Sequence, residues 1–262
     1  QESPRRLRSG GRGQRADEVN HRTNTPLLVA LREQKATRLK GGIYHRTQVD
    51  LTYNSNRIEG SRLTHEQTRC IFETNTIGLT NDAVNVDDIL ETVNHFRCVD
   101  RIIDEADQPL TEALIKELHA MLKQSTTDSR REWFAVGDYK RLPNEVGGME
   151  TCPPEEVADR MQSLLAAYRA DPHPTLESLI DFHHRFESIH PFQDGNGRVG
   201  RLILFKECLG QAIVPFIITD RLKPFYYRGL REWGRMNGYL LDTCLTAQDE
   251  YRALMQYFRI GE

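Results

Sequence analysis

Long apolar runs, paired cysteines and an excess of one charge are all missing from this chain of 262 residues. Its longest apolar run, IVPFII at 213–218, is much shorter than a bilayer span and is interrupted by Pro215. The 5 cysteines are scattered without paired spacing, so we expect reduced thiols and a cytoplasmic location. No signal peptide is visible at the first residues, and we expect no membrane association.

The balance of charge excludes a general attraction to nucleic acid or to anionic membranes. The chain has 35 basic and 38 acidic residues, a net charge of −3. Residues 1–25 differ, because they are rich in Arg, Gly and Ser and poor in apolar residues. We interpret this stretch as a flexible basic arm that is solvated, in preference to a nucleic-acid-binding segment.

The remaining pattern predicts an all-α fold. Thr64 with Gln67 forms a capping-box pattern, Asp87 or Asp88 can open a helix, and Pro153-Pro154 is a good helix start. Residues 140–152 are the exception, because Gly147-Gly148 predicts a turn between two short extended pieces. We predict helices at about 26–39, 43–59, 64–76, 86–106, 111–124, 154–170, 174–189, 197–211, 221–233 and 246–259.

Residues 190–201, HPFQDGNGRVGR, carry the clearest chemical information. Pro191 disfavours helical geometry at His190, so this imidazole lies at a helix exit, where it can act as a general base. Asp194 precedes a Gly-Asn-Gly turn that exposes backbone N–H groups at the start of a new helix, a favourable place for phosphate. Arg198 and Arg201 are three residues apart, share a helix face and can bind phosphate oxygens.

This segment resembles the signature of the Fic family, His-Pro-Phe-x-Asp-Gly-Asn-Gly-Arg-x-x-Arg, at every specified position. The resemblance implies a Fic-type helical bundle with a small β-hairpin flap that transfers AMP from ATP to a Ser, Thr or Tyr hydroxyl of a target protein. It further implies that His190 deprotonates this hydroxyl, that Phe192 anchors the loop and that Asp194 holds Mg²⁺. By the same resemblance Gly195, Asn196 and Gly197 form the anion nest, and Arg198 and Arg201 bind the β- and γ-phosphates.

A second segment resembles the inhibitory motif of Fic proteins that carry an N-terminal inhibitory helix. Its residues are Ser55, Glu59 and Gly60, and Glu59 is expected in the last turn of a helix, where the helix dipole disfavours a negative charge. The resemblance implies that Glu59 pairs with Arg201 in place of the γ-phosphate, and that it can assist removal of AMP in some members. We therefore divide the chain into the arm at 1–25, a helical region at 26–85 with the inhibitory helix at about 43–60, and a Fic core at 86–262.

The resemblance also places a flap and a tyrosine pair near the nucleotide. It implies that Val146, Gly147, Gly148 and Met149 approach the ATP, although an ordinary surface hairpin explains the same residues. Tyr226 and Tyr227 would contact the adenosine, with core packing as the alternative. The asparagine usual seven residues after the second tyrosine is replaced by Gly234, and Asn237 is the candidate to take its place.

Several alternatives remain open at this point. The donor could be a UMP, GMP or phosphocholine compound instead of ATP, and the chain could bind nucleotide without catalysis. A metal-dependent hydrolase is a weaker alternative, because adjacent helical residues such as His183 and His184 point about 100° apart. Its candidate ligands would be His183, His184, His190, Asp181, Glu187 and Asp194. Self-modification is expected alongside a protein target, and the oligomeric state is open, with a homodimer as one alternative.

Overall fold

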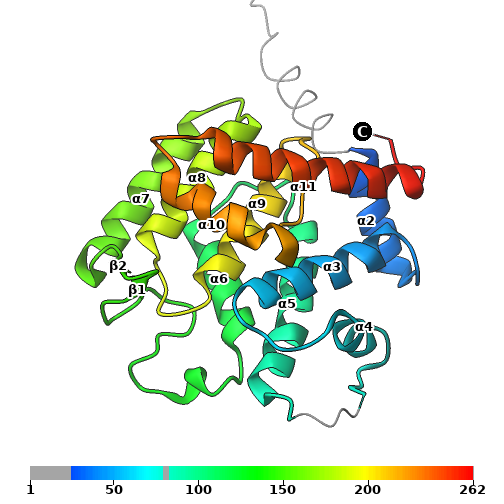
Figure 1. Cartoon of the computed structure of the whole chain (residues 1–262), viewed down its shortest axis with the longest axis horizontal. Helices are drawn as coiled ribbons and strands as arrows, with labels where there is room; N and C mark the ends of the chain where they lie inside the picture. Colours follow the sequence, from blue (N-terminus) through cyan, green and yellow to red (C-terminus); the bar gives the residue numbers. More distant parts are fainter. Residues whose placement is uncertain (1–24, 79–82, 262) are drawn as a thin grey trace, which may run out of the picture.

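The chain folds almost entirely into helices in the part that the computed structural model describes, residues 25–78 and 83–261 (Figure 1). Among these residues no helix is both long and apolar enough to cross a membrane. The basic arm lies outside the described residues except for Thr25, which caps α2. The helices are α2 (Pro26–Thr37), α3 (Ile43–Ile58), α4 (His65–Thr74), α5 (Val86–Asp104), α6 (Glu112–Lys123), α7 (Pro154–Ala170), α8 (Leu176–Ile189), α9 (Asn196–Gly210), α10 (Lys223–Glu232) and α11 (Gly238–Tyr257), with single 3₁₀ turns at Asp128–Arg130 and Asp220–Leu222.

Local signals in the sequence explain most helix boundaries. The capping box at α4 is present, because the Thr64 hydroxyl accepts from the Gln67 N–H and the Gln67 side chain accepts from the Thr64 N–H. Asn85 caps α5, so the helix opens two residues before Asp87, and Asp87 and Asp88 lie in its first turn. The last helix begins at Gly238, eight residues before the predicted start at 246.

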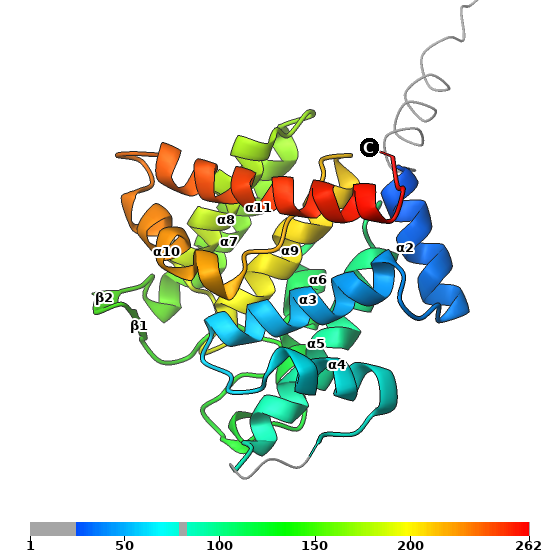
Figure 2. The ribbon, with the colours of Figure 1, turned by 45° about the vertical axis from the view of Figure 1, so that its right-hand side comes forward.

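Helix α9 lies in the middle of the bundle and is buried from Asn196 to Leu209. It packs against α3, α5, α6 and α8 (Figure 2). The N-terminal helices share this core, because Leu28 of α2 and Ile43 of α3 are fully buried in the same apolar cluster as Val199 and Leu202 of α9. Side chains from several helices therefore converge on the first turns of α9.

The predicted hairpin is present and forms the one two-stranded sheet in the described residues. Strands β1 (Glu145–Val146) and β2 (Met149–Glu150) are antiparallel and are joined by Gly147 and Gly148. Both glycines have positive φ, 59° and 79°, which a tight two-residue turn requires and which glycine adopts without strain.

Lys140 ties the base of this hairpin to the loop after α8. Its ammonium donates to the Asn144 amide oxygen at 2.7 Å and to the Thr151 hydroxyl at 2.6 Å. Its backbone N–H donates to the carbonyl of Pro191 at 2.9 Å. The hairpin is therefore held beside the HPF segment by both the backbone and the side chain of one residue.

Helices α10 and α11 cross at a glycine. A Cβ atom built on Gly229 of α10 would lie 2.6 Å from the Cα of Leu240 in α11. Leu240 and Tyr226 are both buried in the apolar cluster beneath this crossing. The missing side chain of Gly229 therefore sets how closely α10, which carries the tyrosine pair, approaches the bundle.

We expect Gly229→Ala to lower the free energy of unfolding by about 1–3 kcal/mol, because the added methyl group pushes against backbone. Gly238→Ala is the matched control, since nothing lies within 4 Å of a Cβ at that position. Urea unfolding of the two variants measures the difference. Equal midpoints would show that the crossing tolerates the methyl group.

Candidate functional site

His190 ends α8 in a left-handed conformation, with φ 52° and ψ 61°. Its backbone N–H donates to the carbonyl of Phe186 at 3.0 Å, and its Nδ1 lies 3.3 Å from the carbonyl oxygen of Glu187. A carbonyl can only accept, so this contact requires a proton on Nδ1 and leaves the lone pair on Nε2. Burial lowers the pKa of His190 below its ordinary value, which keeps the ring neutral at physiological pH.

The loop after His190 is fixed by an aromatic stack and by an asparagine. Phe192 is fully buried and stacks on His119, with ring centroids 4.0 Å apart. The Asn196 side chain accepts from the N–H of Phe192 at 2.7 Å and donates to its carbonyl at 2.8 Å. Asn196 therefore acts on the loop through its side chain, a contact that the sequence did not predict, while its backbone begins α9.

The N-terminus of α9 provides backbone N–H groups and very little side-chain bulk. Gly195 precedes the helix with φ 85°, a conformation that favours glycine. A Cβ on Gly197 would lie 2.2 Å from Oε1 of Glu59 and 3.0 Å from Nη1 of Arg201. The space in front of Gly197 is therefore occupied by the side chain of Glu59.

Arg201 is paired with the end of α3. Its Nη2 donates to Oε1 of Glu59 at 2.6 Å and to the carbonyl of Ser55 at 2.9 Å, and its Nε donates to the Ser55 hydroxyl at 3.1 Å. Burial by itself lowers the pKa of Arg201, but the nearby acidic groups, Glu59 foremost, together outweigh burial and raise the pKa. Gly60 follows Glu59 with φ 99°, so it ends the helix at the point that brings Glu59 to the arginine.

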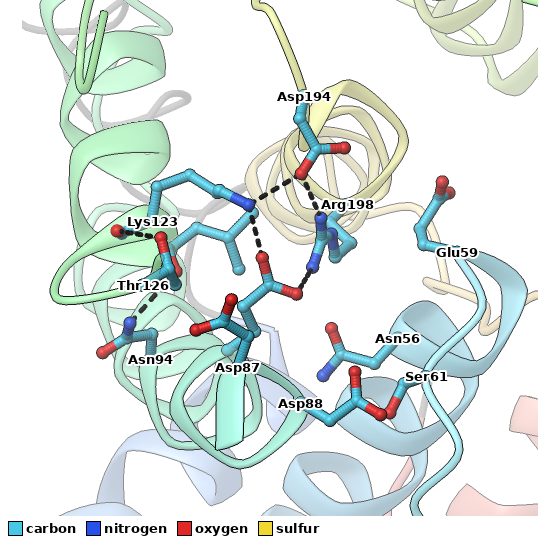
Figure 3. A network of polar contacts seen from close by, with 12 residues as sticks. Asn56, Glu59, Ser61, Asp87, Asp88, Asn94, Lys123, Thr126, Asp194 and Arg198 are labelled. Atoms are coloured by element: carbon cyan, nitrogen blue, oxygen red, sulfur yellow. Dashed lines mark hydrogen bonds and ion pairs between the residues drawn. The ribbon is translucent and has the colours of Figure 1, made fainter. Parts of the chain in front are cut away.

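Arg198 contacts other acidic side chains than Arg201 does. It contacts Glu91 of α5, and its Nη2 donates to Oδ2 of Asp194 at 3.0 Å. Lys123 of α6 donates to the same oxygen of Asp194 at 2.7 Å (Figure 3). Burial by itself raises the pKa of Asp194, but Arg198 and Lys123 lower it well below its usual range.

Asp194 is suited to hold a metal ion only with help from a substrate. Its side chain is 49% exposed, and Oδ1 keeps lone pairs while Oδ2 meets both cations. Within residues 25–78 and 83–261, no three His, Cys, Asp or Glu side chains come close enough together to bind a metal. Mg²⁺ commonly binds one or two carboxylates together with substrate phosphates, so the residues fit this ion in the company of a polyphosphate.

A cavity of about 490 Å³ separates the hairpin from α8 and α10. Val146 and Gly147 line it from the hairpin, and Tyr227 and Arg231 line it from α10. Tyr226 does not reach this space, because it is 1% exposed and its hydroxyl lies 2.7 Å from Nε2 of His183. The structure thus separates the tyrosine pair into one residue that faces the cavity and one that packs in the core.

The other flap residues and histidines are placed as follows. Gly148 forms the turn with Gly147, and Met149 pairs with Val146 through its backbone. His183 is buried, and His184 is partly buried at the lining of the cavity.

Glu187 is a largely buried acid at the lining of the cavity, and the sequence analysis named it only as a hydrolase ligand. A Cβ on Gly200 would lie 2.4 Å from Oε1 of Glu187, so this carboxyl group lies directly against α9. That oxygen is buried without a hydrogen-bond partner among the described residues. Burial raises the pKa of Glu187 to about 8, so the group is protonated at neutral pH.

The raised pKa of Glu187 predicts a stability that falls with rising pH. The folded chain retains this proton above the unfolded pKa of about 4.3, so stability declines from there towards pH 8. We expect Glu187→Gln to match the wild type near pH 4.5 and to be more stable by roughly 1–3 kcal/mol near pH 8.5. Chemical denaturation across this range measures the difference, and a constant difference at every pH would contradict the prediction.

The sequence is similar to known proteins over the region that contains these residues. A family profile described as Fic/DOC family matches residues 109–207. "Protein adenylyltransferase Fic" of Drosophila willistoni is 29% identical over 188 residues, which cover 68% of this chain and 35% of that protein. The protein of the same name from Drosophila virilis is 28% identical and 36% covered. The chain thus spans about a third of the length of these relatives.

Solved structures share the fold. A Fic domain containing signalling protein from Bacteroides thetaiotaomicron superposes with a TM-score of 0.72 at 24% identity, covering 93% of this chain and 95% of that one. Fic-1 from C. elegans superposes with a TM-score of 0.66 at 20% identity, covering 93% and 69%. The predicted all-α bundle with one small hairpin is confirmed by this agreement. The matched profile shows that residues 109–207 are similar to the Fic/DOC family, and the solved structures show that the chain shares their fold.

Proposed function

We propose that this chain is a protein adenylyltransferase that moves AMP from ATP to a hydroxyl group of a protein, under restraint by Glu59. The observation that carries the proposal is the contact of His190 Nδ1 with the carbonyl of Glu187, six residues before α9 begins, which leaves Nε2 as the nitrogen that would take a proton. The names of the Drosophila relatives support the same reaction. The likeness to solved Fic structures supports the fold on which the reaction would depend.

In the proposed reaction, the acceptor oxygen attacks the α-phosphorus while His190 Nε2 takes the hydroxyl proton. The bond from the α-phosphorus to the bridging oxygen breaks, and pyrophosphate leaves. The N–H groups at the start of α9 and the side chains of Arg198 and Arg201 would hold the phosphates in line. A Mg²⁺ ion held by Asp194 would neutralise charge on the α- and β-phosphates.

We further propose that Glu59 competes with a phosphate group for Arg201. The carboxylate accepts from Nη2 at 2.6 Å and fills the space before Gly197, which is where an anion would meet the helix N-terminus. A carboxylate and a phosphate bind the same donors, so both cannot occupy them together. Arg198 is also engaged by acids of the chain, which leaves Arg201 as the cation whose release would admit the γ-phosphate.

The proposal also covers the residues around the nucleoside and some further properties of the chain. Val146, Gly147 and Tyr227 line the cavity and would border the nucleoside together with Gly148 and Met149 of the same hairpin. Tyr226 would lie behind them in the core, where its hydroxyl contacts His183. Removal of AMP by the same site and self-modification belong to the same hypothesis. A homodimer and the division of the chain at residue 86 also remain predictions.

We expect Glu59→Gly to increase AMP labelling from ATP by roughly ten- to a hundredfold. A hydrogen bond to a charged group contributes about 1.5–3 kcal/mol, and 1.4 kcal/mol corresponds to a factor of ten. Labelling of the chain itself by radioactive ATP with Mg²⁺ measures the change. Glu66→Gln removes a surface acid of α4 and serves as the control, and unchanged labelling of the Glu59 variant would eliminate the proposed restraint.

Adding His190→Ala to the Glu59→Gly chain should abolish the labelling, because it removes the proposed base. Retained labelling would show that His190 is not the base. Circular dichroism of the double variant establishes that it is folded.

The identity of the donor can be read from the mass that the protein gains. Glu59→Gly protein incubated with Mg²⁺ and a mixture of ATP, UTP, GTP and a phosphocholine donor should gain the mass of AMP. A gain in the mass of UMP, GMP or phosphocholine would identify a donor other than ATP for the same type of transfer reaction. Nucleotide binding without any mass gain would instead indicate a nucleotide sensor.

A further inference from the structure

Four charged side chains, those of Glu91, Lys123, Asp194 and Arg198, form a closed ring beside the N-terminus of α9. Lys123 Nζ contacts Oε1 of Glu91 at 2.5 Å and Oδ2 of Asp194 at 2.7 Å. Arg198 contacts Oε2 of Glu91 and, at 3.0 Å, the same Oδ2 of Asp194. Each acid is therefore bridged to the other acid by two different cations, and the charges alternate around the ring.

The ring joins parts of the chain that are distant in sequence. Glu91 comes from α5, Lys123 is the last residue of α6, Asp194 precedes α9, and Arg198 lies in its first turn. Figure 3 shows Lys123 and Arg198 approaching Asp194 from two sides. Only Asp194 and Arg198 belong to the HPFQDGNGRVGR segment, so the site residues of the signature do not account for Glu91 or Lys123.

Three of the four side chains of the ring are largely buried, and the fourth is accessible. The side chains of Lys123, Arg198 and Glu91 are 2%, 5% and 14% exposed, whereas that of Asp194 is 49% exposed. Two cations meet on Oδ2, so they fix the orientation of the carboxylate, and its other oxygen keeps lone pairs for a ligand. Lys123 also contacts Asp128 at 3.2 Å, which adds one negative charge at the edge of the ring.

We infer that Glu91 and Lys123 are positioning residues that orient Asp194 and Arg198 and set the local charge that a metal ion and a polyphosphate meet. The inference rests on the proposed function, because it concerns the ligands of that site. Neither residue touches the ligands. The positive charge of Lys123 repels a metal ion at Asp194. The negative charge of Glu91 repels a polyphosphate at Arg198.

This arrangement predicts that neutralising the two residues has opposite effects. Lys123→Gln removes a positive charge beside Asp194, so it should tighten Mn²⁺ binding and weaken ADP binding by roughly three- to tenfold each. Glu91→Gln removes a negative charge beside Arg198, so it should weaken Mn²⁺ binding and tighten ADP binding by roughly the same factors. The double variant keeps one cation and one anion and should lie near the wild type for both.

The test measures the two ligands separately on the full chain. Electron paramagnetic resonance follows Mn²⁺ binding to the ADP-bound chain, and calorimetry follows ADP binding in EDTA. Opposite shifts in the two single variants support the inference. Shifts in the same direction for both ligands, or no shifts, overturn it, because a merely structural ring would weaken Mn²⁺ and ADP alike.

Loss of a buried charge partner can unfold a protein, so the test includes two variants that preserve the charge balance of the ring. Lys123→Arg keeps the charge, and the double variant keeps the ring neutral. Both should bind Mn²⁺ within about threefold of the wild type, and a larger loss in either overturns the inference.

The outcomes also separate this inference from the proposed function. If the Glu59→Gly chain is labelled with AMP but both ligands shift in the same direction in the ring variants, the role of the ring is refuted and the proposed function stands. A wild-type chain that binds neither Mn²⁺ nor ADP, and a Glu59→Gly chain without label, refute both.

Discussion

Two guanidinium groups buried on the first turns of α9 require negative charge beside them, and this requirement arranges the site. A buried cation without a partner is strongly destabilising. Arg198 is paired with Glu91 and Asp194, and Arg201 is paired with Glu59. These acids come from α5, from the loop before α9 and from the end of α3. The packing of helices around α9 therefore determines the charge at its N-terminus. Under the proposed function, a polyphosphate would have to replace part of this charge, beginning with Glu59 at Arg201.

Two glycines of α9, Gly197 and Gly200, make room for acidic side chains against the helix. The carboxyl group of Glu59 lies over Gly197, and that of Glu187 lies over Gly200 on the same side of the helix. Their surroundings give the two acids different properties. Glu59 is 28% exposed and bonded to Arg201, whereas Glu187 is 14% exposed and carries a pKa raised to about 8 by burial. Glu59 is therefore bonded to a buried cation, whereas Glu187 holds its proton between α8 and α9 at the lining of the cavity.

Much of the fold could be predicted because its signals are local. The capping box at Thr64, the start of α7 at Pro154 and the Gly147-Gly148 turn each depend on a few neighbouring residues, and each lies where the sequence predicts it. The start of α11 was predicted too late, because the glycines near it suggest a loop. Burial of Leu240 and Cys244 against α10 stabilises the additional turns, and that contact is tertiary.

By itself, the sequence determined the helices, the hairpin and the set of groups within residues 190–201, since adjacent residues fix a helix exit, a turn and a helix face. Only the tertiary structure decided which charges meet. Glu91 and Glu59 lie 107 and 142 residues from the arginines that they contact, so no local pattern reveals the first of these pairs. The same holds for Tyr226, for Lys123 and for the pKa of Glu187, because burial and neighbouring charge arise only when distant helices pack together.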